Sequence, residues 1–251
     1  MIELKNINVV FNKGTKLENH VLKNIDLTVI EGDVVTIIGG NGAGKSTLMN
    51  ILSGDITANS GKIIIDDQDI TRLPAYQRAA MVARVFQDPT IGTCADLTIE
   101  ENMSFAYKRG QKRGLVMSIN ANLKAKFKDV LSELDMDLEN RLDDKVSGLS
   151  GGQRQALSLI MASMQGSKIL LLDEHTAALD PKIAKLIMEL TSKIIHRYKL
   201  TALMITHSMT QALNYGNRTL MMYHGEIVKD MFGQDRSNLS PDDLVEYFDL
   251  N

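Results

Sequence analysis

Cysteine is almost absent from the 251-residue sequence, which contains only Cys94. One cysteine cannot form an internal disulfide, so a reducing compartment is favoured and the expected role of Cys94 is that of a small apolar filler. No apolar run reaches the roughly 18 to 20 residues that a membrane-spanning helix needs. The first residues, from Met1 to Lys5, alternate as in a strand and show no signal-peptide pattern. We therefore expect a cytoplasmic chain whose membrane role, if any, depends on a partner.

An excess of charge of one sign is also lacking. The 28 Lys and Arg residues nearly balance the 31 Asp and Glu residues, for a net charge of −3. This balance creates no global field toward nucleic acid or anionic lipid, and no nucleic-acid partner is predicted. The basic run Lys108–Gly114 is interpreted as a solvated loop, with contact to lipid headgroups or RNA as the alternative. A hydrophobic content of 44% excludes a disordered chain.

Three short apolar runs are typical of strands buried on both faces. They span residues 34–38, 168–173 and 201–206. A helix is expected over Ser46–Ser53, directly after the first run, and an amphipathic helix over Ile183–Tyr198 separates the other two. This alternation predicts an α/β fold with a parallel sheet. Two antiparallel hairpins are expected as additions to that sheet, over residues 63–70 and 219–228, the second turning at His224-Gly225.

The middle of the chain has a different pattern. From about residue 88 to residue 166 no strand-like run occurs, and apolar residues recur at helical spacing, namely at Leu123, Phe127, Val130, Leu131 and Leu134. Near the end of the sequence, Ser240 and Pro241 form the N-cap and first position of a closing helix. We expect one domain with a core of residues 1–87 and 167–239, a helical subdomain over 88–166 and a C-terminal helix over 240–251.

Gly39–Ser46 reads GGNGAGKS and matches the phosphate-loop pattern G-x-x-x-x-G-K-[ST] between a buried strand and a helix. Glycines let backbone N–H groups converge on phosphate oxygens, Lys45 supplies a positive charge, and the Ser46 hydroxyl can bind Mg²⁺. A plain glycine turn would not need the Lys-Ser pair. The predicted nucleotide-binding residues are Gly39, Asn41, Gly42, Ala43, Gly44, Lys45, Ser46 and Thr47.

Two adjacent carboxylates end the second apolar run. Asp173 lies at the carboxyl edge of the predicted sheet, where it can hold Mg²⁺, and Glu174 can accept a proton from an attacking water as general base. The alternative interpretation is a pair of acids that begins a solvated loop.

Downstream of the helical segment, Leu149–Gln155 reads LSGGQRQ, and with it the chain resembles the ATP-binding-cassette (ABC) ATPases over essentially its whole length. Further motifs of that family follow in family order: a Q-loop glutamine at Gln87, a Walker B strand ending at Asp173 and Glu174, a D-loop aspartate at Asp180 and a switch histidine at His207. Phe11 resembles the aromatic residue that stacks on adenine, with a strand-end core residue as the other interpretation.

The resemblance implies a P-loop NTPase fold with a RecA-like parallel core, an antiparallel β subdomain and an ABC-type helical subdomain. It implies ATP and Mg²⁺ as cofactors, with the metal held by Ser46, Gln87 and Asp173. The implied catalytic residues are Lys45, Gln87, Glu174 and His207. In the family, the signature residues act on ATP held by a second copy of the chain, so two copies would share two sites. Here those residues are Ser150, Gly151, Gly152 and Gln153.

One residue departs from the family pattern. His175 follows Glu174 where most family members have proline. We interpret it as a tolerated loop residue. The alternative is that its charge tunes the pKa of Glu174.

The function that the resemblance implies is ATP hydrolysis that powers a membrane ABC transporter. A free-standing cassette favours an importer, and the stretches from Gln87 to Thr98 and from Asp173 to Thr176 favour a small solute such as an amino acid. The expected partners are a second copy, transmembrane permease subunits and an extracytoplasmic solute-binding protein, with the chain peripheral on the inner face of the cell membrane. The alternatives are a separate-subunit exporter, a non-transport ABC ATPase and a regulatory module without turnover. The intact Glu174 and His207 speak against the last.

Overall fold

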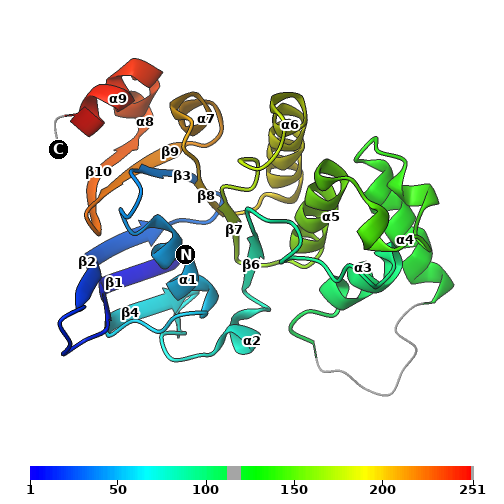
Figure 1. Cartoon of the computed structure of the whole chain (residues 1–251), viewed down its shortest axis with the longest axis horizontal. Helices are drawn as coiled ribbons and strands as arrows, with labels where there is room; N and C mark the ends of the chain where they lie inside the picture. The colour runs from blue at the N-terminus through cyan, green and yellow to red at the C-terminus, as the bar shows by residue number, and fades with distance from the viewer. Residues whose placement is uncertain (112–119, 250–251) are drawn as a thin grey trace.

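The computed structural model describes residues 1–111 and 120–249, except the side chains of 248 and 249. Its centre is a six-stranded sheet of order β10-β9-β3-β8-β7-β6 (Figure 1). The strands are β3 (Val34–Gly39), β6 (Val82–Val85), β7 (Ile169–Asp173), β8 (Ala202–Ile205), β9 (Arg218–Tyr223) and β10 (Glu226–Phe232). All neighbouring pairs are parallel except β9 and β10. The parallel α/β sheet is therefore confirmed, although β6 is a strand that no sequence pattern predicted.

A second, antiparallel sheet lies beside the first, with the order β2-β1-β4-β5. Its strands are β1 (Ile2–Phe11), β2 (Asn19–Val29), β4 (Ser60–Ile65) and β5 (Gln68–Asp69). The hairpin expected over 63–70 exists as β4 and β5, but its place as an addition to the parallel sheet was wrong. Ile65 pairs with Ile2 of β1 instead, because the apolar faces of β1 and β4 share one core with the helix that follows β3.

The hairpin over 219–228 is formed by β9 and β10, as predicted. His224 and Gly225 connect the strands with φ angles of 45° and 86°. Two consecutive left-handed residues are the requirement of the tight turn that suits the twist of a hairpin. Glycine adopts such an angle without steric cost, and His224 tolerates it less readily.

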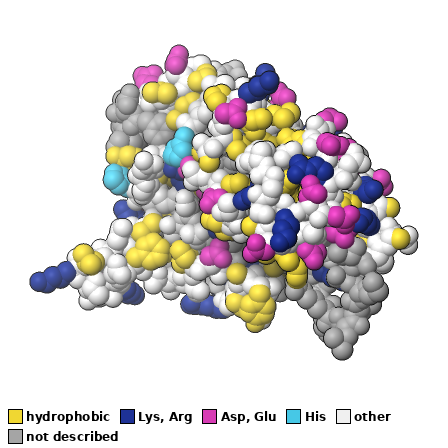
Figure 2. All heavy atoms as spheres, turned by 45° about the vertical axis from the view of Figure 1, so that its right-hand side comes forward, with side chains coloured by type: hydrophobic (Ala, Val, Ile, Leu, Met, Phe, Trp, Pro, Cys, Tyr) yellow, Lys and Arg dark blue, Asp and Glu magenta, His cyan; other side chains and the backbone are white. Residues whose placement is uncertain are grey.

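The helical lobe lies beyond β6 and comes forward in Figure 2, where side chains of both charge signs are interspersed over its surface. It contains α3 (Ile99–Tyr107), α4 (Ala121–Ser132), the short 3₁₀ segments η1 (Leu138–Asn140) and η2 (Val146–Gly148), and α5 (Gly151–Ser163). In its described residues the only β pairing is an isolated bridge between Thr98 and Lys145. Phe127, Leu131 and Leu134 are buried there, as their helical spacing predicted. The basic run continues from residue 112 outside the described residues.

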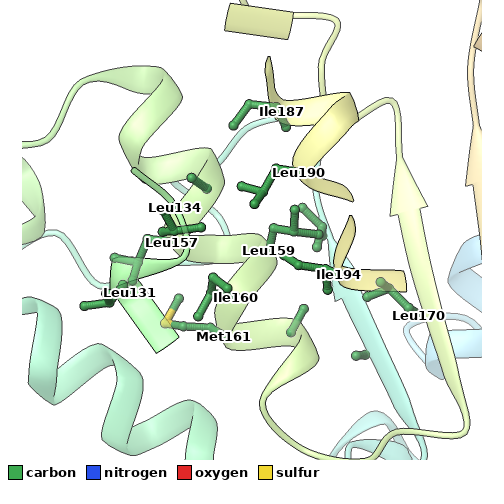
Figure 3. Close-up of a cluster of buried hydrophobic side chains, with 14 of the residues drawn as sticks. Leu131, Leu134, Leu157, Leu159, Ile160, Met161, Leu170, Ile187, Leu190 and Ile194 are labelled. Carbon is green, nitrogen blue, oxygen red and sulfur yellow. The ribbon is translucent and has the colours of Figure 1, made fainter. Parts of the chain in front are cut away.

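The two faces of the parallel sheet are covered by different helices. On β7, Ile169 and Leu171 pack in the cluster that includes α1 (Lys45–Ser53), whereas Leu170 and Leu172 pack with α5 and α6 (Pro181–Tyr198). Figure 3 shows the second cluster, where Leu157, Leu159 and Ile160 of α5 meet Ile187, Leu190 and Ile194 of α6. Because successive strand residues point to opposite faces, an uninterrupted apolar run is what a sheet covered on both sides requires.

The remaining helices are α2 (Ala75–Arg78), α7 (Met209–Asn214), α8 (Gly233–Ser237) and α9 (Pro241–Asp249). The start of α9 agrees with the sequence pattern, because Pro241 is its first residue and the Ser240 hydroxyl accepts a hydrogen bond from the Asp243 amide at 3.3 Å. Cys94 is exposed, so its predicted role as an apolar filler was wrong. None of the helices in the described ranges has the length and hydropathy of a membrane-spanning segment.

Candidate functional site

The phosphate loop connects β3 to α1, as its sequence context predicted. Gly44 caps α1 with a φ of 100°, no side chain caps the helix, and its first turn contains no acidic residue. The amide groups of that turn are therefore not occupied by a capping side chain, which suits a bound anion. A Cβ atom on Gly39 would lie 2.5 Å from the carbonyl oxygen of Met222, so the loop packs directly against β9.

Lys45 is folded back onto the loop. Its ammonium group donates hydrogen bonds to the carbonyl oxygens of Gly39 at 2.7 Å and Gly40 at 3.0 Å, and the residue is only 6% exposed. Burial lowers the pKa of Lys45, while the negative charges of Glu174 and Asp173 act in the opposite direction. Both predicted catalytic carboxylates are thus close enough to influence the charge of the loop lysine.

The other residues of the loop differ in exposure. Asn41, Gly42 and Ser46 are exposed, Thr47 is half-buried, and Ala43 and Gly44 are buried. The exposed residues lie just before α1 and, in the case of Ser46, in its first turn. Ser46 can therefore be reached by a ligand that approaches the N-terminus of α1.

Glu174 and His207 meet at the carboxyl edge of the sheet. They follow the neighbouring parallel strands β7 and β8, in which Asp173 is opposite Ile205. The Glu174 Oε1 atom lies 2.7 Å from His207 Nε2. The Glu174 side chain is 15% exposed, which excludes the interpretation of the acidic pair as the start of a solvated loop. Its φ of 45° is unusual for a residue with a side chain, and such angles concentrate at functional positions.

His175 is a buried core residue. It is 2% exposed, and its Nε2 atom lies 2.9 Å from the hydroxyl oxygen of Thr191 on α6. That hydroxyl donates to the Ile187 carbonyl at 2.7 Å, so the imidazole N–H is the donor to Thr191. Burial lowers the pKa of His175 to about 4, which leaves the ring neutral at neutral pH. The charge-tuning hypothesis was therefore wrong, and the residue is a specific internal contact instead of an indifferent loop residue.

Arg84 on β6 was missed by the sequence interpretation. Its guanidinium donates from Nη2 to Asp173 Oδ2 at 2.6 Å, and from Nη1 to Asn50 Oδ1 at 2.7 Å and Asp55 Oδ2 at 3.0 Å. No motif marks this arginine, and its only sequence signal is its position three residues before Gln87. The positive charge of Arg84 lies beside the negative charge of Asp173 because β6 and β7 are neighbours in the sheet, and no sequence pattern shows this pairing.

The Q-loop glutamine Gln87 is exposed and lies two residues beyond the end of β6. The preceding residue, Phe86, accepts a hydrogen bond through its carbonyl oxygen from Gln155 Nε2 at 3.2 Å. Gln155 is fully buried on α5, and its Oε1 atom has no hydrogen-bond partner among the residues that the structure describes. This contact joins the signature helix to the strand end that carries Gln87.

The signature motif forms the N-terminus of α5. Ser150 accepts from the Gln153 amide at 3.2 Å, and Gln153 Oε1 accepts from the Ser150 amide at 3.1 Å, which is a complete capping box. Ser150 and Gly151 are exposed. Since α1 and α5 cover opposite faces of the sheet, the structure does not bring this motif onto the phosphate loop of its own chain.

Two further predicted residues lie at element ends. Asp180 is the exposed N-cap of α6 and accepts from the Ile183 amide at 3.1 Å. Phe11 ends β1 and is 37% exposed, so it is not a core aromatic.

The donor set at the loop suits magnesium. Over residues 1–111 and 120–249, no cluster of three or more His, Cys, Asp or Glu side chains could hold a metal ion. Mg²⁺ typically takes one or two protein oxygens and completes its shell with phosphate and water. The Ser46 hydroxyl and the Asp173 carboxylate are oxygen donors of this kind.

Comparison with known proteins agrees with this geometry. Residues 22–177 match the family model described as "ABC transporter". The chain is 43% identical over 249 residues to a tyrosine transport ATP-binding protein of Clostridioides difficile, covering 99% of both. It is 32% identical to a methionine import ATP-binding protein of Streptococcus agalactiae, covering 96% of this chain and 68% of that protein.

Among solved structures, a dimeric ATP-binding cassette in a post-hydrolysis state with ADP and phosphate superposes with a TM-score of 0.78. Its sequence is 28% identical, and the match covers 92% of this chain and 98% of that one. Fold, motif order and whole-length similarity agree. The chain belongs to the ABC transporter family, in which it is an ATP-binding and ATP-hydrolysing subunit.

Proposed function

We propose that this chain powers the import of a small, amino-acid-like solute by hydrolysing ATP at sites shared between two copies. The observation that carries the proposal is the 2.7 Å contact between Glu174 and His207 beside the phosphate loop. Whole-length similarity to a protein named for tyrosine transport supports the solute class.

The chemistry follows from charge and position. Lys45 would leave its two loop carbonyls and bind the β- and γ-phosphates. Ser46, Asp173 and Gln87 would hold Mg²⁺, which supplies positive charge to the phosphates when bound. Glu174 would take a proton from the attacking water, and His207, at hydrogen-bond distance from Glu174, would hold that carboxylate and contact the γ-phosphate.

The proposal that two copies share each site depends on the exposure of the signature motif. Ser150, Gly151, Gly152 and Gln153 present the N-terminus of a 13-residue helix to the outside of the molecule. An anion there is stabilised by backbone N–H groups and the helix dipole. We assign these residues to ATP held by the second copy, with Asp180 at the same interface. The dimeric state of the similar cassette supports this arrangement. Phe11, partly exposed at the end of β1, is the candidate for stacking on adenine.

A groove of about 430 Å³ between the sheet and the helical lobe is the candidate docking site for a permease subunit. Large apolar residues on its lining are well exposed: Tyr76 is 74%, Ile91 65% and Phe105 53% exposed. Exposed apolar surface of this kind marks interaction sites. The mixed charges on the helical lobe (Figure 2) favour docking by shape and apolar contact. Such docking would hold the chain peripherally on the inner membrane face, with a solute-binding protein acting through the permease.

The catalytic assignment is tested with Glu174→Gln. We expect ATP hydrolysis to fall at least about a hundredfold, because general-base catalysis contributes factors of that order, while the dissociation constant for ATP stays near the wild-type value. Glu189→Gln on the exposed face of α6 is the matched control and should leave turnover unchanged. Undiminished phosphate release by Glu174→Gln would contradict the assignment.

The solute class is tested in the complex reconstituted with its permease and solute-binding subunits in vesicles. Uptake and ATPase stimulation are compared for tyrosine, methionine and spermidine. We expect an aromatic or other amino acid to stimulate both. Stimulation by spermidine alone, or ATP-driven release of solute to the opposite side, would contradict the proposed import of an amino-acid-like solute.

A further inference from the structure

Arg84 binds the carboxylate that the proposed metal site needs. Its Nη2 atom lies 2.6 Å from Asp173 Oδ2, and Asp173 ends β7 next to Glu174. The Arg84 side chain is 11% exposed and that of Asp173 14%, so solvent screens this pair only weakly. An arginine stays protonated at all relevant pH values. The charge of Asp173 is therefore neutralised by a cation that does not titrate.

The guanidinium has a second carboxylate within reach. Nη1 contacts Asp55 Oδ2 at 3.0 Å and Asn50 Oδ1 at 2.7 Å, both on or just beyond the helix that starts at the phosphate loop. Asp55 is 46% exposed, which makes it the weaker electrostatic partner of the two. Arg84 can consequently give up Asp173 and still retain a paired charge.

The rest of the side chain is held in place. The Cζ atom lies 4.7 Å from the centre of the Phe86 ring, a cation–π contact on the residue before Gln87. The buried Nε atom has no hydrogen-bond partner within the described part of the chain, so oxygen atoms on β7 and α1 determine the orientation of the guanidinium. Arg84 also lines the groove assigned above to the permease.

We propose that Arg84 is a positioning residue that acts as the counter-cation of Asp173, with which Mg²⁺ must compete when nucleotide binds. In the structure the guanidinium holds Asp173. When Mg²⁺ and nucleotide enter, Arg84 transfers to Asp55, or stays near Asp173 and opposes the second cation. Either way, its charge raises the Mg²⁺ concentration that the site requires. This inference rests on the proposed metal site at Ser46 and Asp173.

The test measures ADP affinity by calorimetry, in EDTA and over a Mg²⁺ series, so that no readout depends on turnover. For Arg84→Gln we expect the Mg²⁺ midpoint for tight ADP binding to fall about tenfold, because a repelling charge beside the metal is gone. Affinity in EDTA should change little. Arg84→Lys keeps the charge and should remain within about threefold of the wild-type midpoint.

Asp55→Asn is expected to shift the Mg²⁺ midpoint in the opposite direction, and it provides a test even if Arg84→Gln does not fold. With Asp55 neutral, Asp173 is the one carboxylate of the described residues that still pairs with Arg84, so the Mg²⁺ midpoint should rise about twofold to threefold. A midpoint that falls in Asp55→Asn, or rises in Arg84→Gln, would overturn the proposal. So would a lowered melting temperature with an unchanged midpoint, which is the signature of a structural role. If the wild-type affinity for ADP does not respond to Mg²⁺ at all, the metal site itself fails as well.

Discussion

The N-termini of α1 and α5 look alike in sequence and differ in construction. Glycine lies at both, as the cap residue Gly44 before α1 and as the first residues Gly151 and Gly152 of α5, and neither helix has an acidic residue in its first turn. At α1 the cap is Gly44, buried and left-handed, without a capping side chain. At α5 the cap is Ser150, exposed and closed by a capping box with Gln153. The cap residue of the first is buried in its own chain, and the cap residue of the second faces outward.

A helix N-terminus can present its backbone N–H groups in two ways, and these two helices show both. At the α1 terminus, Lys45 lies close enough to Asp173 and Glu174 for their negative charges to act on it. The α5 terminus has none of these beside it and offers amide groups to another molecule. If the two termini act on one nucleotide, as proposed above, a second copy of the chain must bring them together.

The largest effect is expected from Ser150→Arg, which changes the α5 terminus and leaves the α1 terminus intact. A long cation at the α5 terminus should block approach of the second copy, so ATP hydrolysis by the assembled complex should fall at least about a hundredfold. ADP binding to the single chain should stay within about twofold of wild type, because α1 is untouched. Ser132→Arg, on the exposed end of α4, is the control. Unchanged hydrolysis in Ser150→Arg would end the shared-site interpretation.

A smaller effect, on the free energy of unfolding, is expected from replacing the glycines at the two termini. In Gly44→Ala the new Cβ would lie 2.7 Å from Leu22 Cδ2 at a φ of 100°, so we expect a loss of about 2 to 4 kcal/mol in the free energy of unfolding. In Gly151→Ala the nearest atom is Leu179 Cδ2 at 3.8 Å, and replacing a helical glycine should stabilise by up to about 1 kcal/mol. Urea unfolding of the nucleotide-free chains measures both. Equal losses would show that the two turns are not built differently.

The smallest effect concerns the capping box. Ser150→Ala removes the acceptor for the Gln153 amide, and we expect the free energy of unfolding to drop by about 1 kcal/mol. Asn120→Ala, which removes the equivalent cap of α4, should cost a similar amount. The α1 terminus has no side-chain cap to lose. A Ser150→Ala chain as stable as wild type would mean that the hydroxyl is not committed to its own helix.

Several parts of the fold were predictable because they depend on local pattern. The buried runs at β3, β7 and β8 are continuous apolar segments, and the turn at His224 and Gly225 lies between two strand patterns. By contrast, β6 is short and carries the charged Arg84 in its interior, so no apolar period marks it. The hairpin of β4 and β5 was assigned to the wrong sheet, since local pattern specifies a strand but not its neighbour.

The residues of the site also fall into two groups, those that a local pattern identifies and those whose role depends on distant contacts. The residues of the phosphate loop, the acidic pair and the signature are recognisable by type and spacing, as is His207. His175 and Arg84 were misjudged or missed, because their meaning depends on groups far along the chain. His175 is neutral because the core around Thr191 excludes water, and Arg84 acquires a role because β6 lies beside β7.

The sequence by itself determined the chemistry that this protein can perform, since a lysine in a glycine loop, paired acids and a serine-glycine turn are identified by order alone. Only the tertiary structure decided which groups meet. It places Glu174 in contact with His207 and Asp173 in contact with Arg84, and it packs α1 and α5 on opposite faces of one sheet. The physical reason is that hydrogen bonds and charges act over a few ångströms, and strand order in the sheet sets those distances.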